Sequence, residues 1–421
     1  MKDIIPRSSI STTIRIPGSK SITHRAMIAA ALAEGESLLS DFLSCEDTLY
    51  TAGTLEALGV DISDENGSLR VKGVGGKFPS IHEEKELFMG NSGTSFRLLL
   101  SIAALAKGSF IMTGTPRMKK RPIGTLVKAL SELGAGVSCL DREGYPPVRI
   151  LPEGIRGGTV HMPGDQSSQF ISSILMCAPY AQYDVEVHVT GDLVSRPYLD
   201  ITTDVMARFG VAVEREGYRR FKINAGQGYQ AGKYTIPGDA SSASYFWAAA
   251  AITGGAVVTE NIHPFQTRQG DIHLLDILEK MGAVVERQTD RVHVHADSLQ
   301  GIEVDMSAMP DMVPTLAAIA LFAQGRTVIK NVPHLRLKES DRLAAVAVEW
   351  NRLGAGVEEL EDGLVIHGGR RLIGASVDPH DDHRLAMSLA VIGLKVPGVK
   401  IEDEGCVAKS FPHFWDLWDL L

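Results

Sequence analysis

Two cations, Lys20 and Arg25, lie in the first turn of a helix that the sequence predicts from a Pro-Gly-Ser loop at 17–19 and the small apolar run after it. A helix macrodipole favours anions at its N-terminus, so cations there are unfavourable unless a negative group binds between them and the free N–H groups. A phosphate or carboxylate ligand would remove that conflict. The alternative is a helix capped by Ser19 or Ser21, with both cations solvated.

Other polar groups gather where further helices are expected to begin. A basic run at 117–121 precedes Pro122, which suits the first position of a helix. The segments Ser167-Ser168-Gln169 and Ser195-Arg196-Pro197-Tyr198 open two more helices and offer hydroxyls and an amide to a phosphorylated ligand. The plainer alternatives are a solvated helix entry for the basic run and simple capping for the serines.

Acidic groups join the cations in the second half of the chain. Asp311 opens one expected helix, and the run 334–342 opens the next, with Glu339 and Arg342 one turn apart. These carboxyl groups could transfer protons beside an anion site. The alternative for Glu339 and Arg342 is an ordinary ion pair worth ~0.3 to 0.5 kcal/mol.

The run His380-Asp381-Asp382-His383-Arg384 has the composition of a metal site, but its position argues against one. The two aspartates stand where a helix needs caps for its amides, so we expect helix capping and no metal.

Composition narrows the class of protein. The chain has 421 residues with 44% hydrophobic and 22% charged side chains, which predicts a globular protein of two or more domains. A formal charge of −9 argues against nucleic-acid binding. The four cysteines form no C-x-x-C pair, and no apolar leader or membrane-length run occurs, so we expect a cytoplasmic chain without disulfides. No Gly-x-Ser-x-Gly, dinucleotide or H-E-x-x-H motif is present.

The opening pattern recurs six times. Its anchors are separated by 73, 73, 74, 73 and 69 residues and are Gly18, Asn91, Gly164, Gly238, Asp311 and His380. A second series of glycines follows the helices with the same period and predicts left-handed C-caps at Gly59, Gly134, Gly210, Gly282 and Gly354. Each unit should hold two helices and three or four strands, with Asn66-Gly67 and Asp362-Gly363 as hairpin turns. Units of this length favour two domains of three over a solenoid.

Seven motifs together resemble the family of 5-enolpyruvylshikimate-3-phosphate synthases, within the enolpyruvyl transferases. They are P-G-S-K-S, N-x-G-T-x-x-R, R-M-K-x-R-P, S-S-Q, K-E-S-D-R, D-D-H-R and A-K, and the resemblance extends from Ile16 to Pro412. The resemblance implies an α/β fold of two domains, each of three βαβαββ repeats, of the inside-out α/β barrel type. It places the first domain at 1–18 and 238–421, on the phosphoenolpyruvate side, and the second at 19–237, on the shikimate 3-phosphate side.

The resemblance also implies a reaction and a site in the cleft between the domains. The enolpyruvyl group of phosphoenolpyruvate passes to the 5-hydroxyl of shikimate 3-phosphate and phosphate is released, in the pathway to chorismate and aromatic amino acids, with no metal or organic cofactor. The phosphoenolpyruvate set is Lys20, Asn91, Gly93, Thr94, Arg121, Gln169, Arg342, Arg384 and Lys409. The shikimate 3-phosphate set is Ser21, Arg25, Ser167, Ser168, Gln169, Ser195, Tyr198, Asp311, His334 and Lys338.

Three of these residues are expected to act in catalysis. Glu339 would protonate C3 of the enol ether, Asp311 would take the proton of the 5-hydroxyl, and Lys20 would neutralise the departing phosphate. Three positions depart from the family pattern. His334 replaces a common Asn, Leu98 a common Pro and Ser92 a common Ala. We expect sensitivity to glyphosate, a phosphoenolpyruvate mimic, because Gly93 adds no methyl group.

Two alternative functions remain open. A sister enolpyruvyl transferase that acts on UDP-N-acetylglucosamine shares the repeats but uses a cysteine in the loop matching 113–122, and this chain has none there. A non-catalytic binder of phosphorylated metabolites would need the cations but not both Glu339 and Asp311. We expect a monomer that binds two small-molecule substrates and neither nucleic acid nor membrane.

Overall fold

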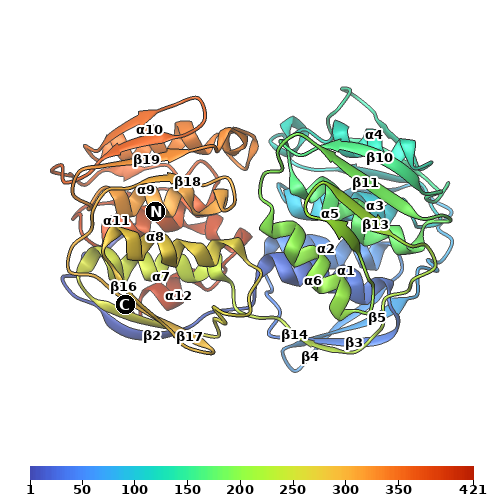
Figure 1. Ribbon diagram of the computed structural model, residues 1–421, viewed down its shortest axis with the longest axis horizontal. Helices are drawn as coiled ribbons and strands as arrows, with labels where there is room; N and C mark the ends of the chain where they lie inside the picture. Colours follow the sequence, from blue (N-terminus) through green and yellow to red (C-terminus); the bar gives the residue numbers. More distant parts are fainter. The chain divides into compact units, whose positions relative to one another are not determined.

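Six small sheets organise the chain, and five of them share one strand pattern (Figure 1). In each of these five, two parallel strands are joined through helices to an antiparallel hairpin, which is the βαβαββ arrangement. A parallel pair of consecutive strands needs a crossover connection, and the first helix of the repeat supplies it in three of the five sheets; in the other two the parallel partner comes from a distant part of the chain. The computed structural model describes all 421 residues. They divide into two compact units, Met1–Pro17 with Pro237–Leu421, and Gly18–Ile236.

Unit Gly18–Ile236 contains three complete repeats. Its sheets have the strand orders β14-β3-β5-β4, β6-β7-β9-β8 and β10-β11-β13-β12. The strands are β3 (Glu34–Ser40), β4 (Asp61–Glu65), β5 (Ser68–Val74), β6 (Lys85–Phe88), β7 (Phe110–Thr113), β8 (Gly136–Cys139), β9 (Val148–Leu151), β10 (Gly158–Pro163), β11 (Val185–Thr190), β12 (Glu214–Glu216), β13 (Arg220–Ile223) and β14 (Lys233–Thr235). The α-helices are α1 (Lys20–Leu32), α2 (Glu46–Ala57), α3 (Gly93–Ala103), α4 (Gly124–Glu132), α5 (Ser168–Cys177) and α6 (Pro197–Arg208), with short 3₁₀ turns η1 (Met118–Lys120) and η2 (Ala178–Tyr180).

The other unit contains two complete repeats and one shortened one. Its sheets have the orders β2-β15-β17-β16, β18-β19-β21-β20 and β1-β23-β22. The strands are β1 (Lys2–Asp3), β2 (Ser11–Arg15), β15 (Ala256–Glu260), β16 (Val284–Arg287), β17 (Arg291–His295), β18 (Glu303–Asp305), β19 (Arg326–Lys330), β20 (Gly356–Glu359), β21 (Leu364–His367), β22 (Ser376–Val377) and β23 (Lys400–Ile401). The α-helices are α7 (Ala240–Thr253), α8 (Leu274–Met281), α9 (Val313–Ala320), α10 (Arg342–Arg352), α11 (His383–Gly393) and α12 (Phe414–Trp418). The 3₁₀ turns are η3 (Gly270–His273), η4 (Pro310–Met312), η5 (Pro333–Leu337) and η6 (Glu404–Lys409).

The first repeat of each unit is completed by a strand from a distant part of the chain. β14, which precedes α7, pairs in parallel with β3, whereas β2, which precedes α1, pairs in parallel with β15. Both pairings lie within one unit, and the chain passes from one unit to the other between Pro17 and Gly18 and again between Ile236 and Pro237.

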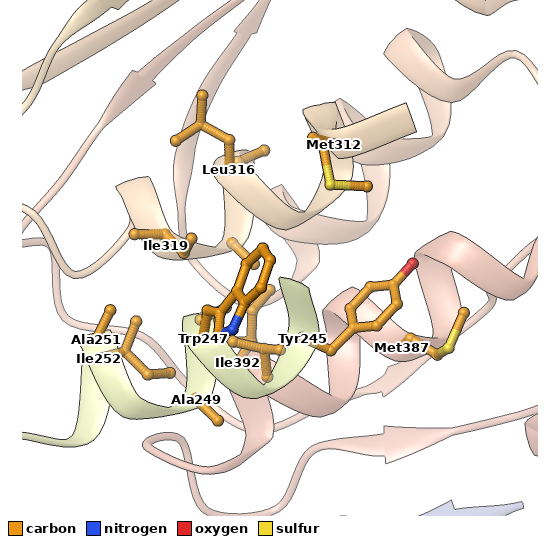
Figure 2. Packing of buried hydrophobic residues seen from close by; sticks show 14 of the residues in the cluster. Tyr245, Trp247, Ala249, Ala251, Ile252, Met312, Leu316, Ile319, Met387 and Ile392 are labelled. Atoms are coloured by element: carbon orange, nitrogen blue, oxygen red, sulfur yellow. The ribbon is translucent and has the colours of Figure 1, made fainter. Parts of the chain in front are cut away.

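The helices that open the repeats, α1, α3, α5, α7, α9 and α11, fill the interior of each unit and are buried along nearly their whole length, because their sequences are apolar or small nearly all round. α7 is buried along almost its whole length, and small alanines let its neighbours approach closely. Figure 2 shows Trp247 of α7 beside Ile319 of α9 and Ile392 of α11. The Trp247 indole N–H donates to Thr259 Oγ1 at 2.9 Å, so its polar atom is satisfied inside the core. Sheets outside and helices inside agree with the predicted inside-out fold.

The predicted glycine caps are confirmed: all five have φ between 81° and 108°. The Asn66-Gly67 turn is also confirmed, with both residues at positive φ between β4 and β5. Asp362-Gly363 also lies in a hairpin turn, between the antiparallel strands β20 and β21, but this connection has four residues, 360–363. The sixth repeat lacks its hairpin, and β1 pairs antiparallel with β23 in its place. None of the helices has the length and apolar character that crossing a membrane requires.

Candidate active site

Lys20 is the first residue of α1 and is not solvated. Its Nζ lies 2.9 Å from Asp47 Oδ2, and both side chains are largely buried. Asp47 belongs to the first turn of α2, where a carboxylate also suits the helix dipole. Ser19 occupies the N-cap position of α1, but its hydroxyl makes no hydrogen bond, so the predicted cap by Ser19 is wrong.

Arg25 is fully buried, and its partners are all neutral. The guanidinium donates to Thr202 Oγ1 at 2.7 Å, to the Ser21 carbonyl at 2.9 Å, and to Ser172 Oγ and the Tyr198 carbonyl at 3.5 Å. Burial lowers the pKa of Arg25 to about 10. No carboxylate is among these partners, so a buried positive charge is held by dipoles alone.

Arg121 and Gly93 are in direct contact at the start of α3. Arg121 Nη1 donates to the Asn91 carbonyl at 3.0 Å. A Cβ at position 93 would lie 2.5 Å from Arg121 Nη2, so any larger residue there would force the guanidinium to move. Arg121 follows η1, whereas α4 begins at Gly124 with Ile123 as N-cap. Pro122 is therefore not at the first helical position, and that prediction is wrong.

Gln169 connects the first turns of α5 and α3. Its Nε2 donates to Thr94 Oγ1 at 3.0 Å, and its Oε1 accepts from Arg97 Nη1 at 2.8 Å. Ser167 is the N-cap of α5 and accepts from the Gln169 amide at 3.3 Å.

Ser168, Ser195 and Tyr198 complete the predicted set in this unit. Ser168 is the buried first residue of α5. Ser195 is buried at a φ of 55°, just before α6, and Tyr198 is the second residue of α6.

In the other unit, Arg342 is surrounded by three carboxylates. Its Nε lies 2.7 Å from Asp382 Oδ2, its Nη1 2.9 Å from Asp311 Oδ1, and its Nη2 2.9 Å from Glu339 Oε2. Burial opposes ionisation of Arg342, but the three acids raise its pKa above the ordinary value. Glu339 precedes α10, whose N-cap is Asp341, so its ion pair with Arg342 is not a helical i,i+3 pair.

Asp311 lies in η4 and is shared by several cations. Its Oδ2 lies 2.9 Å from Arg384 Nη2, and its Oδ1 lies 3.8 Å from Lys338 Nζ in addition to the Arg342 contact. Burial would raise the pKa of Asp311, but Arg384, Lys338 and Arg342 hold it well below its usual range. The N-terminal turns before or at α9, α10 and α11 are thus joined by ion pairs.

His334 and Lys409 are buried near the same elements. His334 lies in η5, is 6% exposed, and neither of its ring nitrogens makes a hydrogen bond. Burial and the neighbouring Lys338 lower its pKa to about 4, so the ring is neutral at pH 7. Lys409 ends η6, which packs against α11, the helix that carries Arg384.

The predicted residues thus fall into two groups, one per unit. One group contains Lys20, Ser21, Arg25, Asn91, Gly93, Thr94, Arg121, Ser167, Ser168, Gln169, Ser195 and Tyr198, and the other contains Asp311, His334, Lys338, Glu339, Arg342, Arg384 and Lys409. Sequence reasoning missed Asp47 and Asp382 as partners of Lys20 and Arg342. It also left Arg97 unassigned, although this arginine ends the N-x-G-T-x-x-R motif.

The His380–Arg384 run forms a helix cap. Asp382 is the N-cap of α11 and accepts from the Arg384 amide at 3.1 Å. No group of three or more His, Cys, Asp or Glu side chains has an arrangement that could hold a metal ion. The expected capping role is confirmed for Asp382, whereas Asp381, at a φ of 54°, lies outside the helix.

Fold and side chains together define a two-unit α/β protein whose helix starts carry buried cations and carboxylates. Residues 4–418 match the model of the EPSP synthase (3-phosphoshikimate 1-carboxyvinyltransferase) family. A 3-phosphoshikimate 1-carboxyvinyltransferase of Aliivibrio salmonicida is 45% identical over 98% of this chain and 97% of its own length. One of Methanoculleus marisnigri is 49% identical over 95% and 94%. An EPSP synthase structure from Acinetobacter baumannii superposes with a TM-score of 0.82 at 31% identity, covering 99% of this chain and 97% of its own.

The chain therefore belongs to the EPSP synthase family. It is an enzyme of the 1-carboxyvinyltransferase type, and its reaction belongs to the shikimate pathway.

Proposed function

We propose that the chain transfers the enolpyruvyl group of phosphoenolpyruvate to the 5-hydroxyl of shikimate 3-phosphate and releases phosphate. The single observation that carries the assignment of the site is Arg25. A buried guanidinium without a carboxylate partner is unfavourable by several kcal/mol, and an anionic substrate would supply the missing charge. The shikimate 3-phosphate side of the site lies in the same unit as Arg25. Its residues are Arg25, Ser21, Ser167, Ser168, Ser195 and Tyr198.

The phosphoenolpyruvate side draws on both units. Lys20, Asn91, Gly93, Thr94, Arg121 and Gln169 come from one unit, and Arg342, Arg384 and Lys409 from the other. Arginine pairs with carboxylate and phosphate oxygens through two parallel hydrogen bonds, which suits a substrate that carries both groups.

When the substrate binds, its carboxylate replaces Asp311 and Glu339 on Arg342 and Arg384, and this replacement prepares the two acids for proton transfer. In the structure Asp311 and Glu339 occupy the guanidinium nitrogens that the substrate's carboxylate would need. When the substrate takes those positions, both acids lose part of their positive surroundings, and the pKa of Asp311, which those cations hold down, rises. Asp382, fully buried on Arg342 Nε, stays as the permanent counterion.

The proton transfers follow from that exchange. Glu339 gives a proton to C3 of phosphoenolpyruvate, C2 becomes cationic, and the substrate's 5-oxygen adds to C2 as its proton passes to Asp311. C3 then returns a proton to the Glu339 carboxylate as the C2–O bond to phosphate breaks, which restores the double bond, and the departing phosphate takes up the proton held by Asp311. Lys20 and Lys338 stabilise the departing phosphate and the charge on Asp311, and His334, neutral at pH 7, lies on the shikimate 3-phosphate side.

A phosphate-release assay tests this proposal. The purified protein should release phosphate from phosphoenolpyruvate when shikimate 3-phosphate is present and not when UDP-N-acetylglucosamine replaces it. Release with the nucleotide sugar alone would support the sister enzyme, and binding of both substrates without release would support a non-catalytic binder. Glyphosate should inhibit the reaction, and lack of inhibition at millimolar concentration would contradict that prediction.

Assembly and location are predictions of the same proposal. We expect the enzyme to act as a monomer in the cytoplasm, on two small-molecule substrates. Sedimentation equilibrium of the protein checks the first point, since a dimer would appear at twice the 45.4 kDa chain mass.

A further inference from the structure

Arg97 is a buried cation to which no role has so far been given. It lies one turn into α3, is 5% exposed, and stacks its guanidinium 5.3 Å from the ring centroid of Phe170. Its own carbonyl oxygen accepts from Ser173 Oγ at 2.5 Å, so α5 fixes its backbone as well as its side chain. Burying an arginine in this way removes its rotamer freedom and gives it one defined direction.

That direction is toward the carboxamide of Gln169. Arg97 Nη1 donates to Gln169 Oε1 at 2.8 Å, while Gln169 Nε2 donates to Thr94 Oγ1 at 3.0 Å. A glutamine amide has an acceptor end and a donor end that are nearly identical in shape. Because arginine can only donate, it binds the oxygen end and leaves the nitrogen end on the side of Thr94.

We propose that Arg97 is a positioning residue: it fixes the Gln169 carboxamide so that its N–H groups, and not its oxygen, face the anionic substrate. The inference rests on the proposed function, in which Gln169 contacts phosphoenolpyruvate. One N–H of Nε2 is used by Thr94, and the second is available to a phosphate or carboxylate oxygen. Without Arg97 the Gln169 carboxamide can rotate by half a turn. In that reversed orientation its oxygen faces the anion and repels it.

A double-mutant cycle tests the proposal, because it separates coupling through Gln169 from a simple loss of charge. The variants are Arg97→Gln, Gln169→Ala and the double variant. Arg149→Gln serves as the matched control, since Arg149 is an arginine of the same unit that pairs with Glu84 on the surface. The readouts are KM for phosphoenolpyruvate, kcat, and the Kd of inorganic phosphate by calorimetry.

We expect Arg97→Gln to raise KM and the phosphate Kd about tenfold while kcat changes less. The double variant should bind phosphoenolpyruvate and phosphate no more weakly than the single variant with the lower affinity, because Arg97 has nothing left to position once Gln169 is gone. Arg97→Lys keeps the charge and loses the planar guanidinium, so its KM and phosphate Kd should lie between those of wild type and Arg97→Gln. Arg149→Gln should bind like wild type.

Effects that multiply in the double variant would overturn the proposal, as would an Arg97→Gln protein that binds like Arg149→Gln. Thermal unfolding of each variant shows whether it is folded. If the Arg97→Gln protein is not folded, the cycle is repeated with Arg97→Lys in its place. The phosphate Kd arm does not depend on turnover. A wild-type protein without transferase activity would refute the proposed function, while the cycle on phosphate affinity still decides the role of Arg97.

Discussion

Arg25 and Arg342 are both fully buried arginines, but their charge surroundings are opposite. Arg342 has three carboxylate partners, whereas the partners of Arg25 are hydroxyl and carbonyl oxygens. The first arrangement stabilises the protein without ligand, and the second leaves a charge that only a ligand can neutralise. Arg25 therefore lowers the stability of the protein without ligand and raises its affinity for an anionic ligand.

Replacing Arg25 by Met should separate these two quantities. We expect the free energy of unfolding without ligand to stay equal or to rise by ~1 to 2 kcal/mol, because an uncompensated buried charge is removed. KM for shikimate 3-phosphate should rise by about 10- to 100-fold, because charge-assisted hydrogen bonds are lost. Urea unfolding and steady-state kinetics measure the two effects. A variant that is clearly less stable but keeps its KM would show that Arg25 is structural.

His334 should make stability depend on pH. Its pKa is lowered to about 4, so between about pH 6.5 and about pH 4 the unfolded chain binds a proton that the folded chain does not. The stabilising contribution is therefore present above about pH 6.5 and is lost as pH falls towards 4. Between about pH 7.5 and 4.5, wild type should lose about 2 to 3 kcal/mol more than His334→Asn in urea unfolding. Parallel losses in the two proteins would contradict the assignment.

At the level of elements, the starts of α9, α10 and α11 are held together by Asp311 and Asp382. Asp311 in η4 bridges Arg342 at the first position of α10 and Arg384 in the first turn of α11. Asp382 both caps α11 and binds Arg342. An anion that enters this junction must replace Asp311 and does not meet free cations.

Asp311→Asn should consequently bind inorganic phosphate more tightly, by about tenfold, although its turnover falls. The reason is that the amide competes less well for Arg342 and Arg384 than the carboxylate. Calorimetric titration with phosphate measures the change. Asp416→Asn removes an exposed charge in the same unit and should have no effect. Equal or weaker phosphate binding by Asp311→Asn would refute the exchange.

Helix starts were the part of the site that the sequence predicted well. Lys20, Ser168 and Pro197 begin α1, α5 and α6, because turn residues followed by apolar runs report local geometry. Partners from other elements were not predictable. Asp47 lies 27 residues from Lys20, and nothing in its own neighbourhood distinguishes it from an ordinary first-turn acid. Arg97 was visible in a motif, but its direction depends on the packing of α3 against α5.

At the scale of the whole molecule, the repeat period predicted six like repeats but not which distant strands complete the first repeat of each compact unit. β2 and β14 each pair within their own unit, in registers that join residues about 200 or more positions apart in the chain. The spacing of motifs along the chain does not predict which distant strands pair. The shortened sixth repeat was missed for a similar reason, since the anchor at His380 marks a helix start and not the hairpin that should follow.

A crystal structure with shikimate 3-phosphate and glyphosate bound would show which residues hold each substrate. We expect Arg25 and the serines of α5 to bind one ligand together with Lys338 or Asp311. Lys20, Arg121, Arg342 and Arg384 should surround the other, with Asp311 and Glu339 displaced from the arginines. Ligands held by residues of one unit alone, with Arg342 and Arg384 still paired to Asp311, would contradict this expectation.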